Sequence, residues 1–233
     1  MDYREHPAPP SLRPWLACTW ERTGDDGRAR ILPDGCIDVV WTEARGTQIV
    51  GTNSTAFLVA VPLGVRVVGA RLRPGAAPGL LGLEPQLVRD ERPPIEQVLG
   101  DRGARLAWEL ERSTDPAAAL VAWLQRRAER ADRPDRLVAA TVTRLGGSAS
   151  RVDAVAEELG VSERALRRRV TSAVGYGPKR LARVLRLWRA LSAARAGEDL
   201  ARVAYDAGYA DQAHFSGDCR QLAGVPPSAL LAE

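Results

Sequence analysis

Residues 155–166 have the sequence VAEELGVSERAL, and residues 203–216 have the related sequence VAYDAGYADQAHFS. In both stretches an alanine is followed four residues later by a glycine, Gly160 in the first and Gly208 in the second. Glycine takes up the left-handed backbone conformation that ends a helix at little steric cost. The repeat therefore predicts two copies of a short helix, a tight turn and a second helix.

The first copy has the pattern of a helix-turn-helix that contacts DNA. Ser162 is placed to cap the second helix, and Leu166 and Val170, four residues apart, are expected to face the core. The side chains left on its outer face are Arg164, Arg167 and Arg168. Arginine donates two hydrogen bonds to guanine or to a phosphate, so we expect these three side chains to contact double-stranded DNA in the major groove.

The charge of the chain is concentrated in this region. Residues 1–136 carry 19 basic and 19 acidic residues, residues 151–195 carry 11 basic and four acidic residues, and residues 196–233 carry two basic and six acidic residues. A compact basic block in a chain of otherwise balanced charge favours a polyanionic partner. The alternative interpretation is a solvated helical face.

A long helix predicted over residues 178–196 joins the two copies. Such a helix would place the two recognition helices in successive major grooves, about 34 Å apart, whereas a plain helical bundle is the alternative. Lys179 and Arg180, near its start, are expected to contact phosphates. Glycine punctuation predicts further helices over residues 134–145, 151–159, 163–173, 199–207, 211–223 and 227–231.

The stretch at 203–216, together with LAGVPPS at 222–228, resembles the signature of the AraC family over about residues 152–230. The resemblance implies a bacterial regulator that activates or represses transcription through a double helix-turn-helix. It also implies base contacts from the first recognition helix at the three arginines named above. In the second recognition helix it implies contacts from Gln212, Ala213 and Gly217.

The second unit departs from that pattern at three positions. Gly217 stands where the family usually has an arginine, Cys219 stands where it usually has a phenylalanine, and Asp218 adds a negative charge. We therefore expect the second unit to contribute less affinity than the first. The remaining polar residues predicted to hydrogen-bond bases or phosphates are Asp211, Gln212 and His214, and the alternative is that these are simply exposed polar side chains.

The part before residue 130 has the short, β-branched stretches of strands. They lie at 30–32, 36–41, 48–50, 57–61 and 65–72, and Pro33-Asp34-Gly35 predicts a hairpin between the first two. Helical spacing returns over residues 104–111 and after Asp115, a suitable helix cap. The predicted fold class is α+β. A small antiparallel sheet or barrel with helices, residues 1–130, precedes an all-α double helix-turn-helix domain, residues 131–233.

A candidate ligand site lies in this first part. LPDGCIDVVW at 32–41 and GARLRPG at 69–75 resemble an uncharacterised domain found ahead of AraC-type units, which implies a cupin-like sensor or dimerisation domain. The candidate residues for a small-molecule effector are Asp34, Cys36, Asp38, Trp41 and Arg71. The alternative is that these residues serve the turn and the core.

Other functional classes have little support in the sequence. Two histidines and three widely spaced cysteines argue against a metal centre, a hydrolase triad or a disulfide framework, and no cofactor is expected. An enzyme with Cys36 as its nucleophile lacks a histidine base between residues 7 and 213. No secretory signal or membrane span is seen, so we expect a cytoplasmic protein without a membrane partner.

The leading hypothesis is a sequence-specific, effector-responsive transcriptional regulator rather than an enzyme. The alternative hypothesis is a small-molecule sensor whose helical domain acts mainly as a protein-contact module. Contact with RNA polymerase and homodimerisation are further partner hypotheses.

Overall fold

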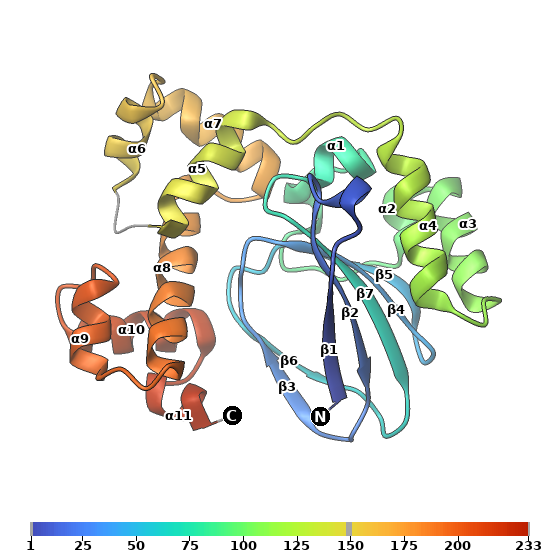
Figure 1. The fold of residues 1–233 in the computed structure, drawn as a ribbon, viewed down its shortest axis with the longest axis horizontal. Helices are drawn as coiled ribbons and strands as arrows, with labels where there is room; N and C mark the ends of the chain where they lie inside the picture. The colour runs from blue at the N-terminus through green and yellow to red at the C-terminus, as the bar shows by residue number, and fades with distance from the viewer. Residues whose placement is uncertain (1, 148–150, 233) are drawn as a thin grey trace.

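The computed structural model describes residues 2–147 and 151–232. A β-rich N-terminal part and a helical C-terminal part lie side by side (Figure 1). This arrangement confirms the predicted α+β class, with an antiparallel sheet ahead of an all-helical region.

Five strands form one antiparallel sheet and two more form a ribbon. The sheet has the order β1 (Asp2–Pro7), β2 (Leu16–Thr23), β7 (Arg66–Leu72), β4 (Ile37–Thr42) and β5 (Gly46–Val50). The ribbon pairs β3 (Arg28–Ile31) with β6 (Phe57–Ala60). The first two strands of the sheet were not predicted, because the charged residues of both and the proline of β1 hide the alternation of a strand.

The predicted hairpin between residues 30–32 and 36–41 is wrong. Strand β3 pairs with β6, whereas β4 lies between β5 and β7. The segment that joins β3 to β4 does not reverse the chain within one sheet but contacts a helix, because the Pro33 carbonyl accepts a hydrogen bond from Trp188 Nε1 at 2.7 Å. Gly35, with φ +81°, lies in this segment, and a Cβ there would come within 3.2 Å of Leu181.

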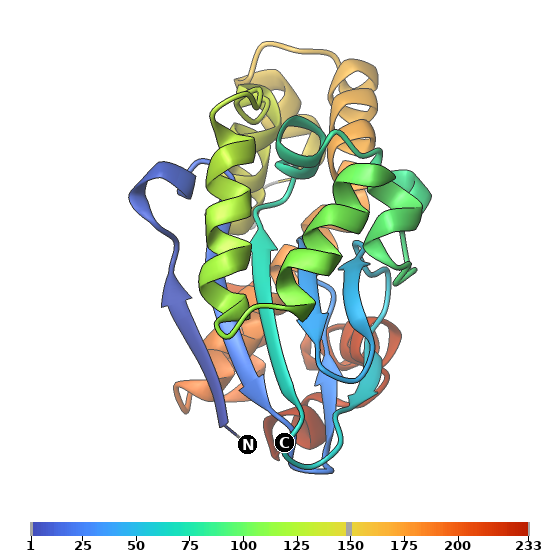
Figure 2. The same ribbon diagram turned by 90° about the vertical axis from the view of Figure 1, so that its right-hand side faces the viewer.

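Helices cover one face of the five-stranded sheet (Figure 2). These elements are the 3-10 turns η1 (Pro10–Leu12) and η2 (Pro85–Val88) and the helices α1 (Ala77–Leu81), α2 (Ile95–Leu99), α3 (Asp101–Glu111) and α4 (Pro116–Ala128). Helix α4 begins as predicted, since the carboxylate of Asp115 accepts a hydrogen bond from Ala118 N at 3.0 Å. The main core lies between these helices and the alternate residues Ile37, Val39 and Trp41 of β4.

In the described residues of the C-terminal part every regular element is a helix, and these helices agree with the predicted ranges to within two residues. They are α5 (Arg136–Gly147), α6 (Val152–Glu158), α7 (Glu163–Val174), α8 (Pro178–Arg195), α9 (Leu200–Asp206), α10 (Gln212–Ala223) and α11 (Pro227–Ala232). Helix α8 runs between two small helical units, each with its own buried cluster. The first unit contains α6 and α7 with α5 packed against them, and the second contains α9, α10 and α11. No helix in the described ranges is both long and apolar enough to cross a membrane.

The two parts are held together by polar contacts as well as by packing. Arg30 Nη1 of β3 donates to Ala223 O at 2.9 Å, and Ala56 N, which directly precedes β6, donates to Leu222 O at 2.7 Å. Leu32 is buried in the same apolar cluster as residues of α8 and α10. The β3–β6 ribbon therefore lies directly against the second helical unit.

Candidate nucleic-acid interface

The two helical units share one backbone design. In each unit a glycine of positive φ ends the first helix, Gly160 at +65° and Gly208 at +83°. The residue after each glycine then donates a hydrogen bond back to that helix, from Val161 N to Ala156 O at 3.0 Å and from Tyr209 N to Ala204 O at 2.9 Å. The predicted repeat is thus present at the level of individual hydrogen bonds.

The second turn is one residue longer than the first. The capping residue follows the glycine by two positions in the first unit, at Ser162, and by three in the second, at Asp211. Ser162 Oγ accepts from Ala165 N at 3.2 Å, and Asp211 Oδ1 accepts from His214 N at 2.7 Å. Leu166 and Phe215, each four residues after its cap, are fully buried. Counting from the caps therefore gives corresponding positions in the two recognition helices.

Three arginines extend from the outer face of α7, as predicted. Arg164, Arg167 and Arg168 are exposed, and none of them has a hydrogen bond or an ion pair within the described part of the chain. The next residue, Arg169, differs because its Nε binds Asp135 Oδ2 at 2.8 Å and so ties α7 to the start of α5. The three unpaired guanidinium groups are available to phosphates or base edges.

The equivalent face of α10 carries short side chains. Counted from the caps, the residues that correspond to the three arginines are Ala213, Ser216 and Gly217. Among their neighbours, Gln212 and His214 are exposed, and His214 Nδ1 accepts a hydrogen bond from Ala210 N at 3.4 Å. A Cβ on Gly217 would meet no atom within 4 Å, so this part of the helix surface is open.

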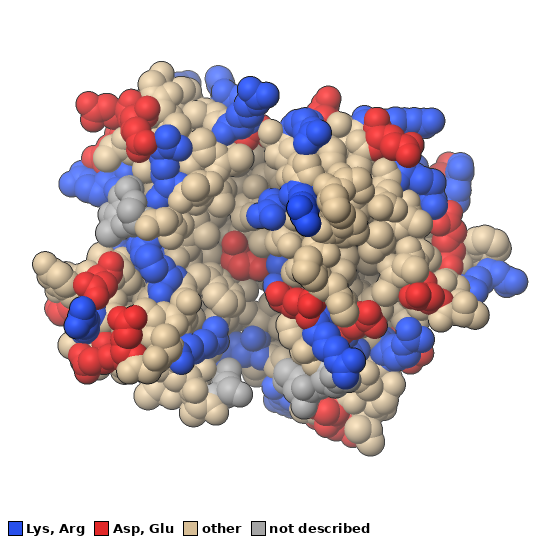
Figure 3. All heavy atoms as spheres, in the orientation of Figure 1, with Lys and Arg blue, Asp and Glu red and all other residues tan. Residues whose placement is uncertain are grey.

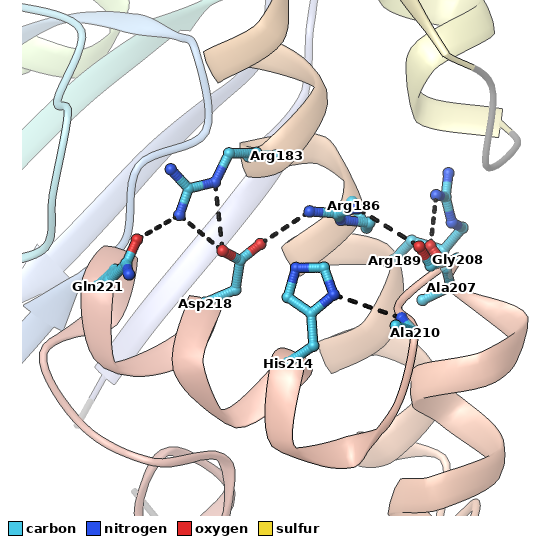
Figure 4. Close-up of polar contacts among 9 residues, drawn as sticks. All are labelled: Arg183, Arg186, Arg189, Ala207, Gly208, Ala210, His214, Asp218 and Gln221. Carbon is cyan, nitrogen blue, oxygen red and sulfur yellow. Dashed lines mark hydrogen bonds and ion pairs between the residues drawn. The ribbon is translucent and has the colours of Figure 1, made fainter.

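The charge of Asp218 had suggested a side chain that faces solvent. Instead, Asp218 is almost completely buried, with 5% of its side chain exposed. Its Oδ1 accepts hydrogen bonds from Arg183 Nη2 at 2.6 Å and Nε at 3.2 Å (Figure 4). Its Oδ2 accepts one from Arg186 Nη2 at 3.1 Å. Two cations of α8 therefore neutralise this carboxylate, and Asp218 does not present a negative charge to DNA.

Arg183 and Arg186 belong, with Arg189, to a line of residues spaced by three along α8, which we call the arginine row. Arg189 donates to the carbonyls of Leu145 and Gly146 in the last turn of α5, at 3.3 and 3.0 Å. It also donates to Ala207 O at the end of α9, at 3.1 Å. Carbonyl groups at helix C-termini carry partial negative charge, so one guanidinium bridges the two units.

A cleft of about 580 Å³ lies between the two units. Its basic lining residues are Arg151, Lys179, Arg183, Arg186 and Arg189, and its acidic lining residues are Asp153 and Glu163. Lys179 is exposed at this cleft, as a phosphate contact requires. Arg180 is oriented differently, because its Nη2 donates to Ser54 O of the N-terminal part at 2.6 Å.

Acidic side chains lie over the first helix of each unit, α6 and α9 (Figure 3). The exposed acidic residues there are Glu157, Glu158 and Asp206, with Asp199 at the cap of α9. Negative charge on these helices repels a polyanion. The exposed cations best placed for DNA are therefore Arg164, Arg167 and Arg168 of α7 and Lys179 at the cleft.

A second site lies within the N-terminal part, between the sheet and the β3–β6 ribbon. It is a cavity of about 320 Å³ whose apolar lining includes Val40, Val59 and Phe57. Among the described residues, Nε of Arg22 and Nε of Arg92 are buried there without a hydrogen-bond partner. The Arg92 guanidinium lies 3.4 Å above the ring of Phe57.

The structure places only part of the candidate ligand set at this cavity. Asp38 and Arg71 line it, with Arg71 Nε 3.5 Å from Asp38 Oδ1 and 3.6 Å from Asp34 Oδ2. Asp34 Oδ1 accepts from Cys36 N at 2.8 Å, which is the turn role considered as an alternative. Trp41 packs in the core on the opposite face of the sheet, so it does not meet the other four residues.

Burial alters the acidity of the groups beside Arg71. It raises the pKa of Asp38 from 3.8 to about 7, and the nearby Arg71 only partly offsets this effect. Burial also raises the pKa of the Cys36 thiol well above 9, with Asp34 and Asp38 acting in the same direction. A thiol in this environment stays protonated and is a poor nucleophile.

Some residues of the two candidate sites were not identified from the sequence. The spacing of Arg183, Arg186 and Arg189 along one helix was visible as a signal, but the carboxylate that meets two of them lies 32 and 35 residues away. Arg22 and Arg92 carried no signal, because only the packing of the ribbon over the sheet brings them to one cavity. No cluster of potential metal ligands occurs in residues 2–147 and 151–232.

Two capped turns in a repeated unit, joined by one long helix and bearing unpaired arginines, define a double helix-turn-helix DNA-binding protein. Residues 155–233 match a family model described as a helix-turn-helix domain, and residues 4–94 match one described as a domain of unknown function (DUF6597). Residues 155–233 therefore form a helix-turn-helix domain of the AraC type. The chain is a DNA-binding regulator of transcription.

The solved structures that match the chain are distant in sequence. The C-terminal domain of AraT, a response regulator from Geobacillus stearothermophilus, is 21% identical with a TM-score of 0.40, over 42% of this chain and 85% of that one. ToxT from Vibrio cholerae is 12% identical with a TM-score of 0.47, over 91% of this chain and 97% of that one. No curated protein matches the chain.

Proposed function

We propose that this regulator recognises an operator with both helical units, and that α7 supplies most of the affinity. The observation that carries the proposal is the trio Arg164, Arg167 and Arg168, exposed and unpaired on a correctly capped recognition helix. Ser162 orders the start of that helix, and Lys179 adds a phosphate contact from the cleft. The second unit contributes a weaker contact through Asp211, Gln212 and His214.

The division between the two functional regions belongs to the same proposal. We assign residues 1–130 to a sensor domain and residues 131–233 to the DNA-binding domain. Arg180 lies at the contact between them, so we assign it to interdomain packing in this state rather than to a phosphate.

Fluorescence anisotropy with DNA tiled from upstream of the gene tests the proposal. We expect binding well above a scrambled competitor, with a steep dependence on salt. Arg168→Ala should lower operator affinity by about 1–3 kcal/mol and relax the preference at one base pair. Lys179→Ala should weaken all sequences alike and reduce the salt slope.

Arg105→Ala is the matched control, because Arg105 is an exposed helical arginine on α3, outside the helical units. It should leave affinity and preference unchanged. Salt-dependent binding without any preference for sequence would contradict the proposal. The absence of DNA binding together with tight binding to a regulator protein would favour the alternative, a sensor with a protein-contact module.

We further propose that the N-terminal cavity holds the effector. Its walls are apolar, and two buried guanidinium Nε donors lack partners, so it fits a small apolar molecule that carries a hydrogen-bond acceptor. A panel of small carboxylates, ketones and hydrocarbons should be screened by thermal shift. We expect acceptor-bearing compounds to stabilise the protein, and Val59→Trp, which fills the cavity, to abolish that shift; equal responses to hydrocarbons would contradict this ligand class.

A catalytic function is not part of the proposal. Cys36 is half-buried with a raised thiol pKa. His6 Nε2 lies 3.4 Å from Glu21 Oε1, and His214 is on α10 of the second helical unit. Contact with RNA polymerase and homodimerisation stay predictions. Sedimentation of the purified chain with and without operator DNA would test the second of these.

A further inference from the structure

We propose that the arginine row and Asp218 determine which distance between two half-sites the protein accepts, although none of these residues need touch a base. The inference rests on the proposed recognition of DNA by both units. Its basis is that all three arginines attach the second unit to α8 and that Arg189 also contacts the first unit, whereas the contacts of a reading residue would run toward DNA.

Polar contacts attach α10 to α8. Both carboxylate oxygens of Asp218 are occupied by arginines of α8, and Arg183 Nη2 also donates to Gln221 Oε1 at 2.6 Å. Asp218 and Gln221 lie on successive turns of α10, so this contact fixes the rotation of the helix as well as its position. Charge-assisted hydrogen bonds of this kind are directional, which an apolar contact is not.

The turn of the second unit is also attached to α8. Arg186 lies over the ring of Tyr209 at 4.3 Å and donates to Gly208 O at 3.4 Å. Arg189 joins the end of α9 to the end of α5, which packs against the first unit. Every residue of the row therefore contacts the second unit, and Arg189 contacts both.

Apolar packing already holds the second unit together. Leu187, Leu191 and Phe215 are fully buried between α8 and α10. Loss of one polar contact of the row should therefore leave a folded unit that can tilt or rotate relative to the first. In some proteins a buried ion pair specifies one arrangement more than it adds to stability, and we infer that role for this one.

The DNA makes such an arrangement measurable. Adding one base pair between two half-sites moves the second by about 3.4 Å and rotates it by about 35° about the helix axis. A rigid pair of recognition helices cannot follow that rotation, whereas a loosened pair can. Residues that fix the pair thus act as positioning residues for spacing specificity.

The experiment is anisotropy of the full-length protein on operator duplexes in which the spacer between half-sites is shortened or lengthened by one or two base pairs. For the wild-type protein we expect one spacer to be preferred, with about a 30-fold loss of affinity for a change of one base pair. D218N and R189Q should bind the preferred spacer more weakly and reduce that loss to about 5-fold or less. R195Q, an exposed arginine of α8 beyond the row, should keep the wild-type profile.

Spacing tolerance separates this role from a merely structural one, since general destabilisation lowers affinity for all spacers by one factor. Circular dichroism and thermal unfolding establish that each variant is folded, and R189Q alone decides the matter if D218N does not fold. Wild-type discrimination between spacers in both variants would overturn the inference while leaving the proposed function intact. A wild-type protein that does not distinguish operator from scrambled DNA would overturn the proposed function itself, and the inference with it.

Discussion

Gly217 limits what the second recognition helix can contact. It occupies the position that Arg168 has in α7, its backbone is helical, and a Cβ there meets nothing within 4 Å. Gly217→Arg should raise operator affinity about 5- to 30-fold, because an arginine on this face adds one phosphate or base contact. Anisotropy titrations at several salt concentrations would measure it, with Gly217→Ala as the control that changes the helix without adding charge. Unchanged affinity in Gly217→Arg would show that α10 does not approach DNA at this point.

Asp38 gives the N-terminal part a dependence on pH near neutrality. Its pKa is about 7 in the folded chain and near 3.8 when the side chain is in water, so ionisation opposes folding. Compared with Asp38→Asn, the wild-type protein should therefore lose on the order of 2 kcal/mol of unfolding free energy as the pH rises from 5 to 7. Urea unfolding of both proteins at pH 5, 6, 7 and 8 tests this, and a constant difference would contradict it.

At the scale of elements, the helices could be predicted from local sequence, whereas the pairing of the strands could not. Ser162 and Asp115 cap their helices as expected, because a cap and the amide that it accepts are three residues apart. Strand β3 was assigned the wrong partner, since its true partner, β6, follows it by more than 20 residues and is selected by packing over the sheet. Strands β1 and β2 were missed for the related reason that only their pairing makes them strands.

At the candidate interface, too, features set by neighbouring residues were predicted, and contacts between distant segments were not. Arg164, Arg167 and Arg168 were found because helical periodicity and a cap fix which face is outward. The partnership of Asp218 with Arg183 and Arg186 depends on how two helices far apart in sequence meet, and sequence reasoning gave Asp218 the opposite role. Trp41 was placed with Asp38 although the two point to opposite faces of β4.

At the scale of the whole molecule, Gly175 is a point where the first helical unit touches the N-terminal part. It has φ +95°, and a Cβ there would lie 2.8 Å from Thr52 Oγ1 and 3.1 Å from Pro85 O. Gly160, with φ +65°, has nothing near its Cβ position, so alanine there meets only backbone strain, about 1 kcal/mol.

Gly175→Ala should therefore destabilise the full chain by about 1–2 kcal/mol more than Gly160→Ala does. Chemical unfolding of the two variants beside the wild-type protein gives both values. Equal losses of unfolding free energy in the two variants would mean that the contact at Gly175 adds nothing to the stability of the full chain. A larger loss at Gly175 would show that the parts unfold as one cooperative body.

The β3–β6 ribbon has one face on the cavity and its edge on the second helical unit, and Arg30 takes part in both, lining the cavity while donating to Ala223 O. Thermodynamic linkage between two sites is always reciprocal: if an occupant of the cavity changes operator affinity by some factor, the operator changes the affinity for that occupant by the same factor. Operator DNA thus becomes a reagent for finding the effector, because a compound that promotes DNA binding is held more tightly by the DNA-bound protein than by the free one.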